Sequence, residues 1–255
     1  MSDIEQFEAV VSSSCDLYTV LEASLWLNHR DTLVSKAKSF DKKLFIALPD
    51  IMRDRDEKTV DRLLFDLDCD SVAGCFCNNP EALAHVYFKG YQKSVIAGPS
   101  LYAWNKEAYR FLSGLSDAIV APLELSRSEI GRVSEDMYVF AYGRIPLMNT
   151  ANCVLKTALS CQKKKVGNMA KLKDRMNAEF PVHTRCDFCF NSIYNSVPTS
   201  LQDEVSEGKI DKGSVLLYMT EESFEKTENV IKAFLEGDSL KGSGYTKVYR
   251  KRGVE

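Results

Sequence analysis

Short apolar runs alternate with helical stretches through the first 145 residues, and this alternation constrains the fold more than any other feature of the sequence. We predict strands at 7–11, 17–21, 43–48, 71–75, 94–97, 117–121 and 137–142. Helices are expected between them, at 23–39, 58–67, 79–89, 105–112 and 127–133. Strands that alternate with helices at this spacing are typical of βαβ units around a parallel sheet.

This number of strands favours a TIM-barrel-like parallel β/α domain, complete or partial, over a doubly wound sheet, which is the alternative α/β architecture. We place that domain at residues 1–148, followed by a Cys-rich segment at 149–200 with few strand signals. A small α+β extension occupies 201–255, with a strand expected at 215–219 and a helix at 223–235. The sequence has no G-x-G-x-x-G and no Walker loop, so the usual nucleotide-binding motifs are absent.

The Cys-rich segment carries the sharpest chemical signal, the pattern C-x7-C-x24-C-x2-C formed by Cys153, Cys161, Cys186 and Cys189. Two thiolates at C-x-x-C spacing can bind one metal centre from a single turn. Four clustered cysteines in a reducing compartment favour a metal or cluster site, with buried thiols or a redox disulfide as the alternatives. The long first spacing favours an iron–sulfur cluster over zinc, because structural zinc sites usually show two short pairs.

The other cysteines have a simpler interpretation. Cys15, Cys69, Cys75 and Cys77 lie on or beside predicted strands and are expected in the core. Cys75 and Cys77 are near the carboxyl end of a strand, where barrel active sites are built. His183 precedes Cys186 by three residues and is an alternative metal ligand.

Charge is distributed unevenly along the chain. The formal net charge is −3, yet the stretch from Cys153 to Cys189 has eight Lys or Arg against three acids. A basic stretch can lie along phosphates, so RNA is a candidate partner, and an ordinary solvated face is the alternative. The contacts would be Lys163, Lys164, Lys165, Lys247, Arg250, Lys251 and Arg252.

Nothing in the sequence indicates a membrane or a secreted protein. No apolar run approaches the roughly 20 residues needed to span a bilayer. Acids precede the first apolar stretch, where a secretory signal has a positive start. We therefore expect a cytoplasmic protein with no membrane partner.

A series of motifs begins at the last predicted strand of the first domain. They are Tyr142-Gly-Arg-Ile-Pro-Leu-Met148, Thr150, Cys153, Leu172-Lys-Asp-Arg175, Phe180-Pro-Val182, Cys186, Ile193-Tyr-Asn-Ser196, Pro198, Leu201, Gly244-Tyr-Thr246 and Arg252-Gly-Val-Glu255. With Ala47-Leu-Pro49 and Leu123-Glu-Leu125 upstream, the sequence resembles the U-32 peptidase family, also called collagenase-like proteases.

The resemblance implies a barrel-like α/β domain with a Cys-rich extension and a 4Fe–4S cluster on Cys153, Cys161, Cys186 and Cys189. Several members act in oxygen-independent hydroxylation of tRNA or rRNA bases or of a quinone precursor, and others are peptidases that degrade collagen. The family's opening Pro-Ala-Gly turn and Gly-Ala-Asp-Ala segment do not occur in this chain. It is therefore expected to correspond to the C-terminal half of a longer member, the rest being supplied by a missing N-terminal half or a second chain.

Three functions remain open. The first is hydroxylation of RNA bases, in which Tyr142, Arg144 and Arg175 would bind substrate. Arg144 suits an anionic co-substrate because a planar guanidinium matches a carboxylate, or it orders the following loop. The second is a peptidase, although no H-E-x-x-H and no nucleophile motif identifies catalytic residues. The third is a non-catalytic module that binds a partner.

Overall fold

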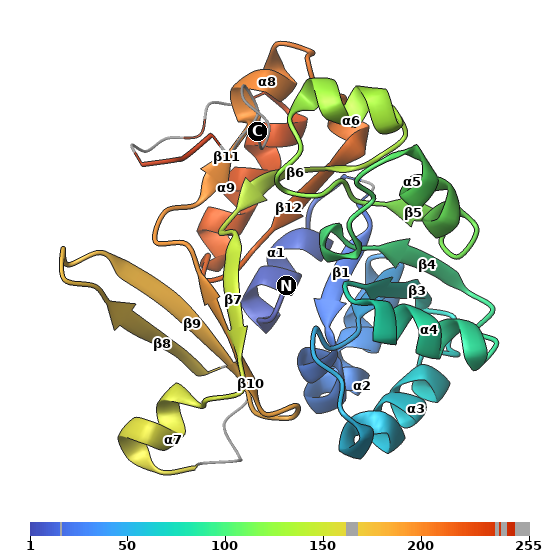
Figure 1. Ribbon diagram of the computed structural model, residues 1–255, viewed down its shortest axis with the longest axis vertical. Helices are drawn as coiled ribbons and strands as arrows, with labels where there is room; N and C mark the ends of the chain where they lie inside the picture. The colour runs from blue at the N-terminus through green and yellow to red at the C-terminus, as the bar shows by residue number, and fades with distance from the viewer. Residues whose placement is uncertain (16, 162–167, 238–239, 241–243, 248–255) are drawn as a thin grey trace.

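The computed structural model describes residues 1–15, 17–161, 168–237, 240 and 244–247, and the arrangement of its elements is drawn in Figure 1. The α-helices are α1 (Ile4–Val11), α2 (Ala23–Ser39), α3 (Glu57–Asp66), α4 (Pro80–Phe88), α5 (Lys106–Ser113), α6 (Arg127–Val133), α7 (Val154–Leu159), α8 (Gln202–Ser206) and α9 (Phe224–Leu235). The strands are β1 (Thr19–Glu22), β2 (Leu44–Ala47), β3 (Val72–Cys77), β4 (Ser94–Ala97), β5 (Ala118–Ile119), β6 (Val139–Gly143), β7 (Pro146–Thr150), β8 (Asn168–Lys173), β9 (Glu179–Arg185), β10 (Phe190–Tyr194), β11 (Thr199–Ser200) and β12 (Val215–Tyr218).

Strands β1 to β5 form a parallel sheet in sequence order, with helices between successive strands. This confirms the predicted mixed α/β domain built on a parallel sheet. The series of parallel strands continues past β5. Val120, after β5, forms a parallel bridge with Tyr138, just before β6, and β6 pairs in parallel with β12. No pairing of β12 with β1 closes the ring among the residues described, and α1 packs against α9 on that side of the molecule (Figure 1).

The predicted strand at 7–11 is wrong, because these residues belong to helix α1. The Asp3 side chain caps the helix by accepting a hydrogen bond from the backbone of Glu5 at 2.7 Å. Phe7, Val10 and Val11 are then buried together at helical spacing. The run Phe7–Val11 contains two adjacent valines, and such short apolar runs do not distinguish a buried strand from a buried helix.

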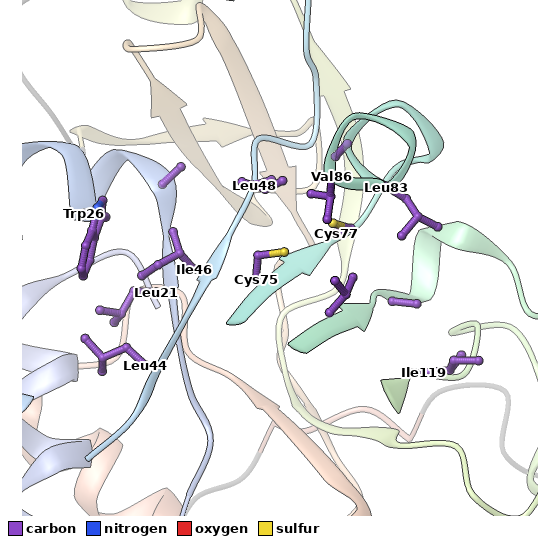
Figure 2. Close-up of a cluster of buried hydrophobic side chains, with 14 of the residues drawn as sticks. Leu21, Trp26, Leu44, Ile46, Leu48, Cys75, Cys77, Leu83, Val86 and Ile119 are labelled. Atoms are coloured by element: carbon purple, nitrogen blue, oxygen red, sulfur yellow. The ribbon is translucent and has the colours of Figure 1, made fainter. Parts of the chain in front are cut away.

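The parallel strands bury one face of the sheet, whereas residues of the other face such as Phe76 and Ile96 are only partly buried. One face packs on α2 to α5 through a core that includes Leu21, Leu44, Ile46, Cys75 and Cys77 (Figure 2). Cys75 and Cys77 are fully buried there, which confirms the predicted core position of these two thiols. The alternate residues of the same strands face a cavity, which is described below.

The expectation of few strands in 149–200 is wrong. An antiparallel sheet in the order β7-β10-β9-β8 fills most of this stretch (Figure 1). The inner strand β9 contains Pro181, which cannot donate to a ladder, and buried polar residues such as Thr184 and Arg185. Neither proline nor buried polar side chains suggest a strand, so a pattern of apolar residues cannot identify β9.

The last part of the chain is attached to the parallel strands by direct pairing. β11 lies antiparallel to β6, and β12 lies parallel to β6 on its other side. The strand and helix expected at 215–219 and 223–235 are confirmed as β12 and α9. In the described part of the chain, no helix combines the length and the apolar character that crossing a bilayer requires.

Candidate functional site

A cavity of about 910 Å³ lies along the inner face of the parallel strands. Successive strands contribute alternate side chains to its wall, including Val20, Phe45, Phe76, Ile96 and Phe140. Its volume is within the range of small-molecule pockets, which are mostly apolar with a few polar groups. Several of its polar side chains, among them Glu22, Asp50 and Asn78, lie where β1, β2 and β3 end.

An ion pair from two distant parts of the chain forms one wall of the cavity. Arg185, at the end of β9, donates from Nη2 to Glu22 Oε1 at 2.6 Å and to the Tyr194 hydroxyl at 2.9 Å. The Tyr194 hydroxyl lies 3.1 Å from the Tyr218 hydroxyl, so the network continues to β12. Arg185 Nη1 and Glu22 Oε2 are buried without a hydrogen-bond partner. The ion pair therefore leaves one polar atom on each partner without a hydrogen bond.

The charge states of this network follow from its burial. Burial alone would raise the pKa of Glu22, but the positive charge of Arg185 and the nearby His183 lower it to about 2. Burial lowers the pKa of His183 to about 4, although its Nδ1 lies 3.7 Å from Glu22 Oε2. At neutral pH, Glu22 is thus ionised and His183 is neutral.

A second carboxyl group lines the cavity a short distance along the sheet edge. Asp50 follows β2 and accepts a hydrogen bond from Asn78 Nδ2 at 3.1 Å. Burial raises the pKa of Asp50 and the charge of Glu22 adds to this, while Arg185 and the hydrogen bond from Asn78 oppose it. The cavity therefore contains two carboxyl groups whose pKa values are displaced in opposite directions.

The four cysteines of the spacing motif lie beside this network. Cys186 directly follows Arg185 and begins the turn between β9 and β10, where Cys189 has a left-handed backbone with φ of 51°. Arg53 holds this turn by donating to the carbonyls of Phe188 and Cys189 at 2.7 and 3.4 Å. Burial raises the pKa of the Cys186 thiol, and acidic neighbours raise it further; they are Cys153, Asp187, Cys161 and Cys189.

The thiols come from two separate stretches of chain. Cys153 caps α7, and its Sγ accepts a hydrogen bond from the Lys156 backbone at 3.4 Å. Cys161 and Cys189 are exposed, and Cys186 is half-buried. The other three thiols therefore lie close enough to Cys186 to raise its pKa.

The four cysteines provide the donor atoms that a metal site needs, but they are not arranged as the ligands of one metal ion. Cysteine thiolates are the ligands of iron–sulfur clusters, and zinc also accepts them. However, across the residues described no three His, Cys, Asp or Glu side chains are placed so that they could hold one metal ion. Binding one metal ion would therefore require these side chains to rearrange.

The other predicted site residues lie outside the main cavity. Tyr142 is fully buried, its hydroxyl donates to Glu222 Oε1 at 3.2 Å, and burial raises its pKa. Arg144 pairs with Glu221 at 2.7 Å and donates to the carbonyls of Asn195 and Ser196. It therefore orders the loop that follows β10. Arg175 is exposed in the turn between β8 and β9.

Sequence reasoning missed Glu22, Asp50 and Arg185. Glu22 and Asp50 directly follow predicted strands, and in parallel α/β sheets ligands bind at the carboxyl ends of the strands. That rule could have identified both residues. Arg185 gave no signal of its own, because an arginine beside a cysteine usually indicates an exposed basic residue.

Several residues proposed to contact RNA cannot be placed. Lys163, Lys164, Lys165, Arg250, Lys251 and Arg252 lie outside the described residues. Lys247 is described and pairs with Asp203 at 2.7 Å.

Comparison of the chain with protein-family models, with curated proteins and with solved structures finds no match.

Proposed function

We propose that this chain is an iron–sulfur protein of the U-32 peptidase-like family that takes part in oxygen-independent hydroxylation of RNA bases. The observation that carries the proposal is the adjacency of Arg185 and Cys186 at the end of β9. Arg185 forms the ion pair in the wall of the main cavity, and Cys186 is the centre of the four thiols. One strand end therefore links a candidate redox centre to a pocket for a small molecule or a base.

The fold supports the same proposal. We interpret β1 to β6 and β12 as an incomplete TIM-type barrel, because each contributes side chains to one cavity. In such barrels the chemistry takes place at the carboxyl ends of the strands. Glu22, Asp50 and Asn78 occupy those positions after β1, β2 and β3.

The cysteines suit a cluster for an electrostatic reason. Burial and the nearby acidic groups raise the pKa of Cys186, so this thiol resists ionisation in the absence of a cation. A bound metal reverses this effect, because a coordinating thiol is deprotonated outright. A 4Fe–4S cluster on Cys153, Cys161, Cys186 and Cys189 would supply electron transfer when bound. Zinc on the same thiols is the alternative.

RNA is the proposed substrate because the stretch from Cys153 to Cys189 has eight Lys or Arg against three acids. Within it, Lys173 and Arg175 are exposed at the β8–β9 turn, at the end of β9 opposite to Cys186, and basic side chains of this kind attract phosphates. A peptidase is less well supported. Among the hydrogen bonds of the described residues, none joins a serine or cysteine side chain to a histidine, as a Ser or Cys nucleophile with a His base would.

Metal analysis tests the cofactor. Protein purified without oxygen should be brown and contain four iron and four sulfide per chain. Cys186→Ser should lose the iron and also some stability, because metal-binding free energy is folding free energy. Cys15→Ser is the matched control, since Cys15 is also half-buried but lies outside the group. A colourless protein with one zinc would refute the iron assignment, and full iron in Cys186→Ser would remove Cys186 from the ligands.

Nucleoside analysis tests the reaction. RNA from cells that lack the gene should lose a nucleoside one oxygen atom heavier than its parent, as measured by mass spectrometry. The wild-type gene and Cys15→Ser should restore it, and Cys186→Ser should not. An unchanged set of nucleosides in the deletion strain would refute the proposed substrate.

A further inference from the structure

Three polar side chains from three separate elements meet in one corner of the main cavity. Asp50 follows β2, Asn78 follows β3, and Arg185 ends β9. Asn78 lies 3.1 Å from Asp50, and the charge of Arg185 acts on the same carboxyl group. The corner is therefore assembled by the tertiary structure and belongs to no local motif.

The orientation of Asn78 is fixed by its second contact. Its Oδ1 accepts a hydrogen bond from the backbone of Ser100 at 3.2 Å, so its Nδ2 faces Asp50 Oδ1. The neighbouring Gly98 has no side chain, and a Cβ there would collide with Asn78 Oδ1. One oxygen of Asp50 is thus held in place by a donor that cannot turn away.

Of the four carboxyl groups that line the cavity, Glu22 and Asp50 differ in their partners. Glu22 accepts a hydrogen bond from Arg185 at 2.6 Å, so its negative charge is neutralised directly. Asp50 has no cation within ion-pair distance in the described residues, and its hydrogen-bond donor Asn78 is neutral. Burial therefore favours the protonated form of Asp50 and raises its pKa, while the pKa of Glu22 is lowered. When the pKa values of two carboxyl groups in one cavity are displaced in opposite directions, one group can act as an acid while the other stays charged.

We propose that Asp50 exchanges a proton with the molecule bound in the main cavity, and that Glu22 only holds Arg185. This inference rests on the proposed function, in which that molecule is an RNA base. In the transfer, the O–H bond of Asp50 breaks and the proton moves to a ring nitrogen or carbonyl oxygen of the base. The carboxylate that remains is stabilised by Asn78 and by the charge of Arg185, and the reverse transfer restores the acid.

The groups that face Asp50 all have defined roles. Glu22 on β1 disfavours its ionised form, while Arg185 on β9 favours it. Asn78 after β3 and Asn149 on β7 donate hydrogen bonds to it. Asp50 is thus the carboxyl group of this corner whose surroundings favour the protonated form, because burial raises its pKa.

The test uses Asp50→Asn in the full chain, with exposed Asp136→Asn as the matched control. We expect Asp50→Asn to lower the hydroxylated nucleoside at least about 100-fold in the complemented deletion strain, which is the usual loss for a proton-transfer group. Iron content and thermal midpoint should stay at the wild-type values. Asp136→Asn should match the wild type in all three measurements. A product level within twofold of wild type in Asp50→Asn would overturn the inference.

A spectroscopic measurement separates this inference from the proposed function. Because burial raises the pKa of Asp50, an infrared titration should show one protonated carboxyl band, shifted by 13C-labelled aspartate, that persists to a higher pH than the bands of the other aspartates. The band should be absent from Asp50→Asn, and in Asp50→Glu it should no longer respond to the aspartate label. A deletion strain with unchanged nucleosides refutes the RNA substrate, whereas a missing band in the wild type refutes Asp50 as the acid. If Asp50→Asn does not fold, Asp50→Glu and the wild-type spectrum still decide.

Discussion

Replacing Glu22 by glutamine removes one charge from the buried network and leaves its shape almost unchanged. Arg185 keeps its hydrogen bond to the Tyr194 hydroxyl at 2.9 Å, and the glutamine carbonyl can still accept from Nη2. However, Arg185 loses the carboxylate with which it pairs. Because Arg185 is only 6% exposed, water cannot replace that carboxylate. The variant therefore measures the cost of an unpaired buried guanidinium.

Two estimates of this cost agree. Removing one partner of a buried ion pair destabilises a protein by about 3–5 kcal/mol. The pKa of Glu22 in the folded chain is about 2, against about 4.3 in an unfolded chain. A displacement of that size corresponds to about 3 kcal/mol of stability. We expect Glu22→Gln to lower the free energy of unfolding by about 3 kcal/mol at neutral pH, the lower end because glutamine keeps one hydrogen bond.

The effect should depend on pH in a defined direction. The folded state lowers the pKa of Glu22, so the stabilisation is fully present above the unfolded value and is lost as the pH falls through the folded value. The difference between wild type and Glu22→Gln should therefore shrink as the pH is lowered from about 4.3 towards 2.

Urea unfolding followed by circular dichroism, at neutral pH and at several acidic values, measures this difference. Glu135→Gln, an exposed loop residue, is the control and should change stability by less than about 0.5 kcal/mol. The double variant Glu22→Gln with Arg185→Met should be more stable than the single variant, because no buried charge is left unpaired. A loss below about 1 kcal/mol for Glu22→Gln, or a loss that does not change in acid, would refute the reasoning.

Two further predictions concern residues beside this network. Burial lowers the pKa of His183 from about 6.5 to about 4, so the free energy of unfolding should fall as the pH drops through that range. His183→Gln should flatten this part of the pH profile measured by urea unfolding. An unchanged slope would contradict the lowered pKa of His183. Gly143 has φ of 129°, and a Cβ there would collide with the Tyr218 carbonyl, so Gly143→Ala should lower the thermal midpoint and cost about 2–4 kcal/mol. Wild-type stability in Gly143→Ala would show that β6 and β12 are not held this closely.

Local sequence patterns placed several helices and strands of the first domain correctly. Helices α2 and α6 have the predicted bounds, and β4 does also. The pattern misled at Phe7–Val11, where the capping Asp3 starts a helix. It gave no indication of β9, because Pro181 and buried polar residues lack strand periodicity.

The residues of the candidate site also differ in whether the sequence could identify them. Spacing alone identified the four cysteines as a group, and their joint effect on the pKa of Cys186 agrees with their being neighbours. Spacing could not identify Arg185 or Asp50, because nothing near either residue in the sequence indicates its partner. Arg185 pairs with Glu22 across 163 residues of chain, and Asn78 lies 28 residues from Asp50.

The sequence by itself determined the alternation of strands and helices, and hence a parallel sheet with a buried face, because periodicity and turn residues act over a few neighbouring positions. Its cysteine spacing also led to the prediction of a shared thiol centre. The tertiary structure alone decided that the carboxyl ends of β1, β2 and β3 meet the end of β9. Charges brought together in a buried cavity interact strongly there, and that proximity gives Glu22, Asp50 and Arg185 their distinct roles.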